Sequence, residues 1–472
     1  MGAKQMRLNW RDLDSARARE LDGATVKIEG FAAIVLPAAG ASHFILAAEQ
    51  GCCPGCFPRG RGGSVEVFAA APVPLRGRSM GLTGTLRVRD DDPSGWRYQL
   101  LDARLLEPPG WTAVTRRGVL ASGPLMCLAA CAQAESPQTV SQRQADARRA
   151  IEAAPSVDIH SHAGGVASLR HMRDGWPFDP VGQPMRSGGM AAACLAVTSD
   201  GPTHRIMSDG RIHPYREPFP DELYQYSQTA FGRVHQLARE QGLIVIKDTA
   251  GLRAARAGTA SAIIAAEGAD FLEGKADRVE ETYAKWDLRH LQLTHYRVNE
   301  LGDIQTEAPV HGGLTDFGAE VIRRCNRAGI VVDVAHGTYD LVKRAATVAT
   351  KPLVLSHTSL TGNPGPYSRL ISPDHARIVA STGGVIGVWP PASVYPSLSA
   401  MATGMARLAD VAGVDHVALG SDMKGLVGPS IFPDYDHLPA LAEALLEVGF
   451  NVADATKVLG GNYARVFEAC MA

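Results

Sequence analysis

A His-x-His pair within residues 156–162 has the residue types and the spacing of a metal site. The segment reads as a short strand that follows a long polar, helix-like stretch. Alternate side chains of a strand share one face, so Asp158, His160 and His162 are expected to point the same way. Two imidazoles on one face at a strand end can hold one metal ion. The pair is also compatible with two ordinary histidines, and the rest of the chain decides between these interpretations.

Residues with metal-binding or acid–base side chains also end most of the other strand-like segments. Eight segments between residues 157 and 421 are short and apolar enough to predict strands. Any one histidine among them would alone be interpreted as a hydrogen-bonded side chain. The occurrence of such residues at the ends of several strands predicts a metal site. Several polar side chains buried together at one end of the strands are costly without partners. Six of the eight strands contribute: His160 and His162, Glu267, His295, His336, His357 and Asp422.

The order of these elements predicts an α/β protein with a closed (β/α)8 barrel of the TIM type from about residue 151 onward. Amphipathic stretches such as 316–327 and 374–380 separate most of the strands. The extra apolar run 243–246 fits a short additional segment, an excursion of the chain before the third β/α unit. A doubly wound open sheet is the alternative, but no glycine-rich phosphate loop follows the first strand. The predicted strands are 157–160, 191–197, 262–267, 290–295, 330–336, 353–357, 385–389 and 417–421.

The composition narrows the class of protein. The chain has 472 residues, of which 45% are hydrophobic and 20% are charged, and its formal net charge is −2. This length allows roughly two or three domains with a large core. The near-neutral charge gives no indication of a nucleic-acid partner or of an acidic membrane surface. No apolar run is long enough to cross a bilayer. The eight cysteines do not form a disulfide framework.

Residues 1–110 predict a separate small all-β domain, either a barrel or a sandwich. Short apolar runs alternate with turn residues at 24–28, 44–46, 64–67, 82–86 and 98–101. The segment resembles a small uncharacterised bacterial β-domain, and no role follows from that likeness. Cys52, Cys53 and Cys56 cluster in it and include a C-x-x-C. A metal or redox pair and tight-turn packing both remain open, because no second pair or histidine set completes a zinc site.

Residues 111–150 resemble an export signal followed by a linker. Arg116 and Arg117 precede a short, weakly apolar stretch, which is typical of a twin-arginine signal. The run from Leu128 to Cys131 resembles a lipoprotein processing box, in which Cys131 would carry a lipid anchor. Because the segment is internal, it indicates a fusion, a later start, or a linker derived from a signal. If the segment is used, the barrel is periplasmic or anchored on the outer side of the inner membrane; otherwise it is cytoplasmic.

Eight stretches along the predicted barrel match those of a known family in order and in spacing. They are Asp158-Ile-His160-Ser-His162, Ala266-Glu267-Gly268, Leu293-Thr-His295-Tyr-Arg-Val-Asn299, Asp333-Val-Ala-His336, Ser356-His357-Thr-Ser359, Gly384-Val-Ile-Gly387, Leu419-Gly-Ser-Asp422 and Gly460-Gly-Asn-Tyr463. With these stretches, residues 151–472 resemble the membrane (renal) dipeptidase family, a branch of the amidohydrolase-type metal-dependent barrels. The resemblance does not cover residues 1–150.

This resemblance implies a hydrolase with two Zn²⁺ ions that cleaves small dipeptides by attack of a metal-bound hydroxide. His160 and His162 would hold one ion, His336 and His357 would hold the second, and Glu267 would bridge both. Two divalent ions a few ångströms apart need a shared anionic ligand to offset their repulsion. A carboxylate can span them, whereas an imidazole cannot.

The resemblance also implies roles for three further residues. Asp422 would take a proton and pass it to the leaving amine, with orientation of a metal ligand as its alternative role. His295 would bind the substrate and either polarise its carbonyl or stabilise the oxyanion. Arg369 would clamp the substrate carboxylate, a task that suits its guanidinium fork. A surface arginine on a loop is the alternative for Arg369.

One residue departs from the family's pattern. The family usually has His-x-Asp in the first motif, where this chain has His162. An imidazole preserves the number of ligands, but the site loses one negative charge. A related hydrolase of N-acyl amino acids or lactams is therefore an alternative. A non-hydrolytic exported barrel involved in metabolite maturation is another, although such a barrel has no need of Glu267 and Asp422. A homodimer is compatible with either kind of function.

The long polar loop 201–219 is expected to lie over the mouth of the barrel and to shape substrate choice. His204 and His213 within it are interpreted as solvated loop histidines. Trp389, which follows the seventh strand, is expected to line the pocket.

Overall fold

The protein is described from a computed structural model that covers residues 6–13, 16–33, 41–48, 64–73, 79–88, 98–106, 140–167, 169–172 and 175–472. The chain divides into two compact units, Met1–Thr139 and Val140–Ala472. The cysteine cluster at 52–56 and the twin-arginine segment with Cys131 lie outside the described residues. Their roles, like export and a homodimer, stay predictions. No helix among the described residues combines the length and the apolar character that crossing a bilayer requires.

The first unit is a small β-domain, as its alternating sequence predicts. Its strands have the order β1-β2-β3-β4-β6-β5, and an additional pairing of β2 with β5 brings the ends of the sheet together. Val26, Ile28, Leu82 and Leu86 lie in its buried core. The strands are β1 (Met6–Arg7), β2 (Thr25–Ala33), β3 (Ala41–Ala47), β4 (Ser64–Val73), β5 (Ser79–Val88) and β6 (Tyr98–Leu105), with the short helix α1 (Ala16–Glu20) before β2.

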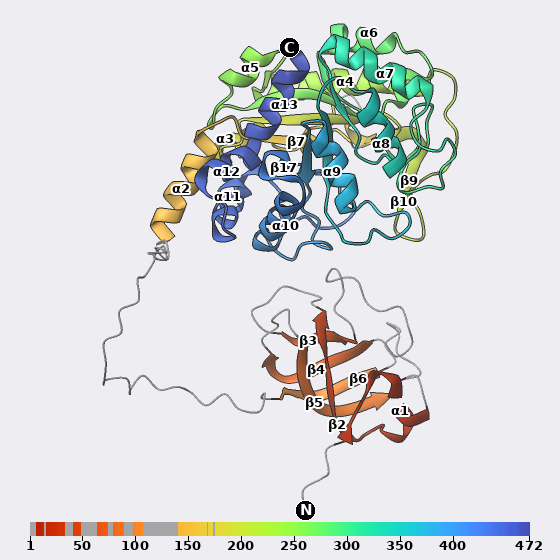
Figure 1. Cartoon of the computed structure of the whole chain (residues 1–472), viewed down its shortest axis with the longest axis vertical. Helices are drawn as coiled ribbons and strands as arrows, with labels where there is room; N and C mark the ends of the chain where they lie inside the picture. The colour runs from red at the N-terminus through yellow and green to blue at the C-terminus, as the bar shows by residue number, and fades with distance from the viewer. Residues whose placement is uncertain are drawn as a thin grey trace, which may run out of the picture. The chain divides into compact units, whose positions relative to one another are not determined.

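The second unit contains the predicted (β/α)8 barrel (Figure 1). Its strands are parallel, and the pairing of β8 with β12 closes the sheet. Every residue of these strands is buried, which explains their near-continuous apolar sequences. The barrel strands are β7 (Val157–Ser161), β8 (Ala192–Thr198), β12 (Ser261–Glu267), β13 (Leu288–Gln292), β14 (Val331–Asp333), β15 (Leu353–Thr358), β16 (Val385–Val388) and β17 (Val417–Leu419). The predicted excursion is β11 (Ile244–Val245), which pairs with β12.

Amphipathic helices follow most of the barrel strands, and side-chain caps fix where several of them begin. The hydroxyl groups of Thr315, Thr338 and Ser372 each accept the backbone N–H three residues later, a contact that stabilises a helix by about 1 kcal/mol. The helices are α2 (Val140–Glu152), α3 (Gly182–Gly188), α4 (Glu222–Gln241), α5 (Thr249–Ala254), α6 (Arg278–Trp286), α7 (Asp316–Ala328), α8 (Tyr339–Val348), α9 (Pro373–Ser381), α10 (Leu398–Ala412), α11 (Leu438–Glu447), α12 (Val452–Thr456) and α13 (Asn462–Met471).

Helix α13 closes one end of the barrel. Tyr463 and Phe467 of this helix share a buried cluster with Val157, Val331 and Val385, which are the first residues of β7, β14 and β16. The amino-terminal end of the barrel is therefore filled with apolar side chains. Because parallel strands all end at the opposite rim, the polar residues at their carboxyl ends are left to gather there.

Three predicted strands extend too far. β13, β14 and β17 stop at Gln292, Asp333 and Leu419, so His295, His336 and Asp422 lie on the turns that follow. The backbone at His336 and Asp422 has φ values of 66° and 47°, a left-handed conformation that a strand cannot contain.

The predicted loop 201–219 also differs, because it holds an antiparallel hairpin of β9 (His204–Ile206) and β10 (Ile212–Pro214).

Gly387 in β16 shows how closely the barrel strands approach. A Cβ atom at this position would overlap the carbonyl oxygen of Ser356 in β15. We expect Gly387→Ala to lower the free energy of unfolding by roughly 1–3 kcal/mol or more, since neither strand can move without disturbing the sheet. Urea unfolding followed by circular dichroism measures the change. Gly428→Ala is the control, because a Cβ there has no neighbour within 4 Å. Equal midpoints for both variants would contradict this account.

Candidate metal centre

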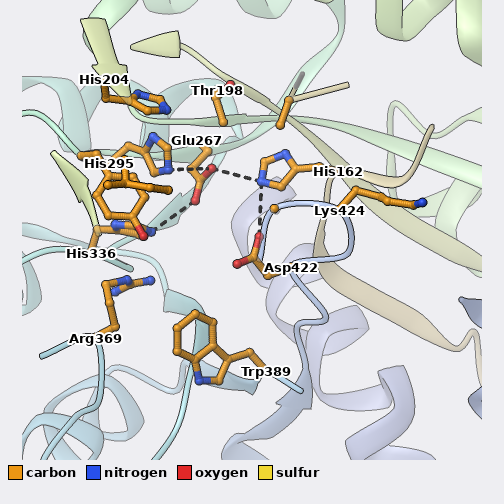
Figure 2. A pocket seen from close by; sticks show the side chains of 14 residues that line it. His162, Thr198, His204, Glu267, His295, His336, Arg369, Trp389, Asp422 and Lys424 are labelled. Atoms are coloured by element: carbon orange, nitrogen blue, oxygen red, sulfur yellow. Dashed lines mark ion pairs between the residues drawn. The ribbon is translucent and has the colours of Figure 1, made fainter. Parts of the chain in front are cut away.

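The carboxylate of Glu267, at the end of β12, is the centre of a ring of histidines at the barrel mouth (Figure 2). Its side chain is only 3% exposed. Each of its two oxygens faces more than one imidazole nitrogen, so no single partner satisfies it. Oε1 lies 3.4 Å from His160 Nε2, 3.3 Å from His336 Nε2 and 3.4 Å from His357 Nε2, and Oε2 lies 3.1 Å from both His162 Nε2 and His295 Nε2.

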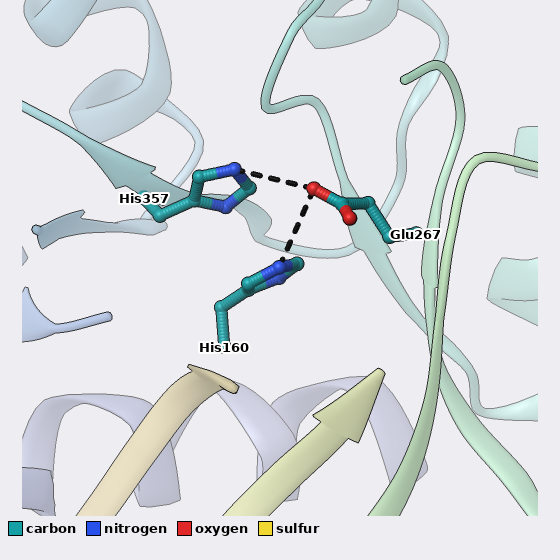
Figure 3. Close-up of side chains that lie close together, drawn as sticks. All are labelled: His160, Glu267 and His357. Atoms are coloured by element: carbon teal, nitrogen blue, oxygen red, sulfur yellow. Dashed lines mark ion pairs between the residues drawn. The ribbon is translucent and has the colours of Figure 1, made fainter. Parts of the chain in front are cut away.

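The histidines also approach one another in two pairs. The Nε2 atoms of His160 and His162 are 3.3 Å apart, and those of His336 and His357 are 3.0 Å apart. Figure 3 shows His160 and His357 directed at the same oxygen of Glu267. Two imidazole nitrogens at such a separation either share a proton or face a common cation. A pair of histidines with a carboxylate between them is a donor set that suits Zn²⁺.

Burial and local contacts prepare these imidazoles to bind a cation through Nε2. His162 Nδ1 lies 2.7 Å from the carbonyl oxygen of Ala196 and donates its proton there, which directs Nε2 toward the centre. Burial lowers the pKa of His336 and of His357 well below the ordinary value, so both rings are neutral. His336 Nδ1 is buried without a hydrogen-bond partner. These features fit a metal, because a metal ligand must be a neutral imidazole.

Asp422 faces the same centre from the turn after β17. Its Oδ1 lies 3.5 Å from His162 Nε2 and 4.0 Å from His160 Nε2. Burial raises the pKa of Asp422, although the nearby histidines oppose this shift. Burial lowers the pKa of His162, but the charges of Glu267 and Asp422 more than offset this and raise it to about 9. The two carboxylates therefore attract positive charge, either a proton or a metal ion, to His162 Nε2.

Arg369 lies on the opposite side of the cavity from Asp422 and His162 (Figure 2). Its Nη1 donates to Gln305 Oε1 at 2.8 Å, and its guanidinium carbon lies 5.5 Å from the centre of the Trp389 ring. Burial lowers the pKa of Arg369. It forms no ion pair with a carboxylate in the described part of the chain, so its charge is available to an anionic group of a substrate. Trp389 lines the cavity beside it, as expected from the sequence.

His295 differs from the other histidines because its second nitrogen meets a carboxylate. Its Nδ1 lies 2.7 Å from Asp200 Oδ1, and Asp200 Oδ2 accepts the backbone N–H of Tyr296 at 3.0 Å. Burial would raise the pKa of Asp200, but His295 and His204 offset it and lower the pKa well below the usual range. The ionised carboxylate thus holds the His295 ring with Nε2 toward the cavity.

Two interpretations from the sequence were wrong. Asp158 does not lie beside the imidazoles of His160 and His162, because the pairing of β7 with β8 shifts register after Asp158 and its carboxylate contacts Ser421 and Tyr435.

His204 is not a solvated loop residue. Its side chain is 15% exposed, it lines the cavity, and its Nδ1 lies 3.1 Å from Asp200 Oδ1.

His213 is also more enclosed than the sequence suggested. Its ring lies between Glu307 Oε1, at 2.6 Å, and Asp209 Oδ2, at 2.9 Å. The contact with Glu307 attaches the β9–β10 hairpin to the loop after β13, whereas Asp209 belongs to the turn of the hairpin itself. The hairpin brings Ile212 to the cavity wall together with His204.

The sequence did not single out Asp200, Tyr296 or Lys424. Asp200 follows the second predicted strand by three residues. It could therefore have been counted among the metal-binding or acid–base residues at the strand ends. Tyr296 and Lys424 line the cavity, but nothing in the sequence distinguishes them from other loop residues. The complete lining is His162, Ala167, Thr198, His204, Ile212, Glu267, His295, Tyr296, His336, Arg369, Trp389, Asp422, Lys424 and Gly425, around a volume of about 180 Å³.

Comparison with protein families identifies the barrel. The model of the membrane dipeptidases, peptidase family M19, matches residues 184–472. The chain belongs to this family. The matched range includes Glu267, His295, His336, His357 and Asp422, and it begins after His160 and His162. The match agrees with the resemblance that the motifs had indicated.

Two of the relatives that the chain matches are named dipeptidases. The chain is 32% identical to dipeptidase aclJ of Aspergillus oryzae over 222 residues, which is 44% of this chain and 51% of the relative. It is 26% identical to dipeptidase verJ of Clonostachys rogersoniana over 220 residues, 45% of this chain and 56% of that one. The chain thus spans about half the length of the curated relatives it matches.

Solved structures of the family share the fold. The probable dipeptidase PvdM of Pseudomonas aeruginosa has a TM-score of 0.57 at 15% identity and covers 71% of this chain and 99% of its own. A metallopeptidase of Rhodobacter sphaeroides, solved with a phosphinate mimic of the dipeptide L-Ala-D-Ala, has a TM-score of 0.54 at 21% identity, covering 67% and 99%. At these identities the likeness establishes the (β/α)8 barrel.

Glu267→Gln tests the centre directly. An amide of the same shape cannot offset the charge of a divalent ion, so we expect metal affinity to fall by more than the roughly 10–100-fold that is typical of residues outside the coordination sphere. Elemental analysis after equilibration with Zn²⁺ measures the metal content. Glu280→Gln is the control, because Glu280 pairs with Arg324 on the surface at 3.0 Å. Wild-type metal content in Glu267→Gln would show that this carboxylate is not a ligand.

Proposed function

We propose that this chain is a metal-dependent dipeptidase with two Zn²⁺ ions at the barrel mouth. The observation that carries the proposal is the buried Glu267 carboxylate inside a ring of five imidazole nitrogens at 3.1–3.4 Å. His160 and His162 would hold one ion, His336 and His357 the other, and Glu267 both. When bound, the ions supply Lewis acidity that polarises an amide carbonyl and acidifies water.

The remaining side chains bind and orient a substrate. Arg369 is a partly buried cation without an ion pair in the described chain, so it would hold the carboxylate of a dipeptide with its guanidinium fork. His295 presents Nε2 to the cavity because Asp200 occupies its Nδ1. With Nδ1–H donated to Asp200, the imidazolium form of His295 would donate a second hydrogen bond, from Nε2, to the oxygen of the scissile carbonyl as negative charge develops on it.

Asp422 is suited to carry the proton between the attacking and leaving groups. Its carboxylate faces the centre beside His162 and lines the cavity. Burial raises its pKa, which makes the carboxylate a better base than an exposed aspartate. A group that accepts a proton from water can then deliver it to the amine that departs.

The size of the cavity and the names of the relatives support a small dipeptide. A volume of about 180 Å³ with the β9–β10 hairpin on one wall leaves little room for a longer peptide. The matched relatives are named dipeptidases, and one structural neighbour was solved with an L-Ala-D-Ala mimic. N-acyl amino acids are the second candidate, because they present the same amide and carboxylate to Glu267 and Arg369. Retention of both Glu267 and Asp422 at the centre favours hydrolysis over binding alone.

A substrate panel with and without metal tests this proposal. The purified full chain, loaded with Zn²⁺, is expected to hydrolyse small dipeptides such as L-Ala-D-Ala, to lose activity with a chelator and to regain it with Zn²⁺. Release of amino acids measures the reaction, and elemental analysis measures two ions per chain. Hydrolysis of N-acetyl amino acids alone would replace the dipeptide assignment. Less than one ion per chain, with no hydrolysis of dipeptides or of N-acetyl amino acids, would refute the assignment of the chain as an enzyme.

Arg369→Met tests recognition of the substrate carboxylate. Loss of a hydrogen bond to a charged group is expected to raise KM for a dipeptide by roughly 10- to 100-fold. The corresponding dipeptide amide, which lacks the carboxylate, should show similar steady-state kinetics with wild type and variant. Arg377→Met is the control, because Arg377 pairs on the surface with Asp374 at 2.7 Å. An equal effect on dipeptide and amide would remove Arg369 from this role.

A further inference from the structure

Two fully buried aspartates lie below the metal centre, outside the cavity. Asp158 belongs to β7 and precedes His160 by two residues, and Asp333 ends β14 and precedes His336 by three. Both side chains are 0% exposed. Neither carboxylate lines the cavity or takes part in the ring around Glu267. A buried carboxylate is costly unless its oxygens accept hydrogen bonds, so the groups that donate to them show what these residues hold in place.

Asp333 connects the two strand ends that carry His336 and His357. Its Oδ1 accepts the backbone N–H of Ala335 at 2.9 Å and that of Ser356, in the neighbouring strand β15, at 3.1 Å. Each donor immediately precedes one of the two histidines in the chain. His290 Nε2 lies 3.1 Å from Asp333 Oδ2 and keeps the carboxylate from rotating.

Asp158 makes the same kind of connection between β7 and its neighbour β17. Its Oδ1 accepts the backbone N–H of Ser421 at 2.8 Å and, more weakly, that of His160 at 3.4 Å. Ser421 immediately precedes Asp422. The hydroxyl groups of Ser421 and of Tyr435 donate to Oδ2, the latter at 3.0 Å. The two aspartates thus use the same arrangement on two separate pairs of adjacent strands.

Both connections end at a strained turn. His336 and Asp422, which follow the tied residues Ala335 and Ser421, have φ values of 66° and 47°. A residue other than glycine adopts this left-handed conformation only where the surroundings impose it. Without the aspartate, the N–H of Ala335 or Ser421 would be buried without this acceptor, and the turn would relax toward an ordinary conformation. His336 would then leave the ring around Glu267, and Asp422 would move away from His162.

We propose that Asp158 and Asp333 are positioning residues that fix the strand ends and turns around the metal centre. Each holds one pair of neighbouring strand ends through a single oxygen, Asp333 the pair with His336 and His357 and Asp158 the pair with His160 and Asp422. The proposal rests on the metal centre of the proposed function. It adds that the geometry of this centre depends on two side chains that touch neither metal nor substrate.

Alanine and asparagine variants of the full chain separate positioning from general stability. Asparagine keeps an Oδ1 that accepts both N–H groups, whereas alanine removes it. Asp158→Ala and Asp333→Ala are expected to lower Co²⁺ affinity roughly 10–100-fold and to change the visible absorption spectrum of bound Co²⁺, which reports ligand geometry. Asp158→Asn and Asp333→Asn should retain the wild-type spectrum. If an alanine variant is insoluble, serine, whose shorter side chain cannot reach both N–H groups, takes its place.

Ile322→Ala is the stability control, because Ile322 is a buried residue of α7 in the outer core. It should lower the melting temperature and leave Co²⁺ affinity and spectrum unchanged. Wild-type affinity and spectrum in both aspartate-to-alanine variants would overturn the proposal, as would an equal loss in Ile322→Ala. Failure of the wild-type chain itself to bind Co²⁺ or Zn²⁺ would instead refute the metal centre and the proposed function with it.

Discussion

The burial of the Glu267 carboxylate is the constraint on which the rest of the barrel mouth depends. A charged carboxylate that is almost out of contact with water must be surrounded by positive charge or by hydrogen-bond donors. Here the neighbours are imidazoles, and burial keeps at least His336 and His357 neutral. Neutral rings whose Nε2 atoms face each other offset the negative charge of the buried carboxylate only in part. A cation between the rings and the carboxylate satisfies both, and this requirement links the fold to metal chemistry.

The barrel meets this requirement because its parallel strands all end at one rim. Glu267 lies within its strand, whereas His295, His336 and Asp422 lie on turns after theirs. Strands place Glu267, His160 and His357, and the turns determine how closely the other three side chains approach them. Apolar side chains of α13 pack against the opposite end of the barrel, and the strained turns at this rim hold the polar groups together.

Much of this arrangement was predictable from the sequence. Eight buried parallel strands are apolar almost throughout, so their number and order could be read directly, and polar residues at their ends marked the rim. The strand ends were less predictable, because nothing in the residues 330–336 shows that the backbone becomes left-handed at His336. The position of the β9–β10 hairpin depends on the contact of His213 with Glu307, and the burial of His204 depends on its contact with Asp200. Such contacts join distant parts of the chain, and no local pattern reveals them.

His162 shows how one substitution at the rim changes the electrostatics of the whole centre. An aspartate at this position would add a carboxylate to a cavity whose described lining contains only two, Glu267 and Asp422. The imidazole instead faces both of these acids, which raises its pKa to about 9. A metal ion at His162 would therefore have to displace a proton, whereas burial lowers the pKa of His336 and of His357 and favours their neutral rings. Under the proposed function the two pairs of ligands are thus unequal, because a proton competes with the cation at His162 but not at His336 or His357.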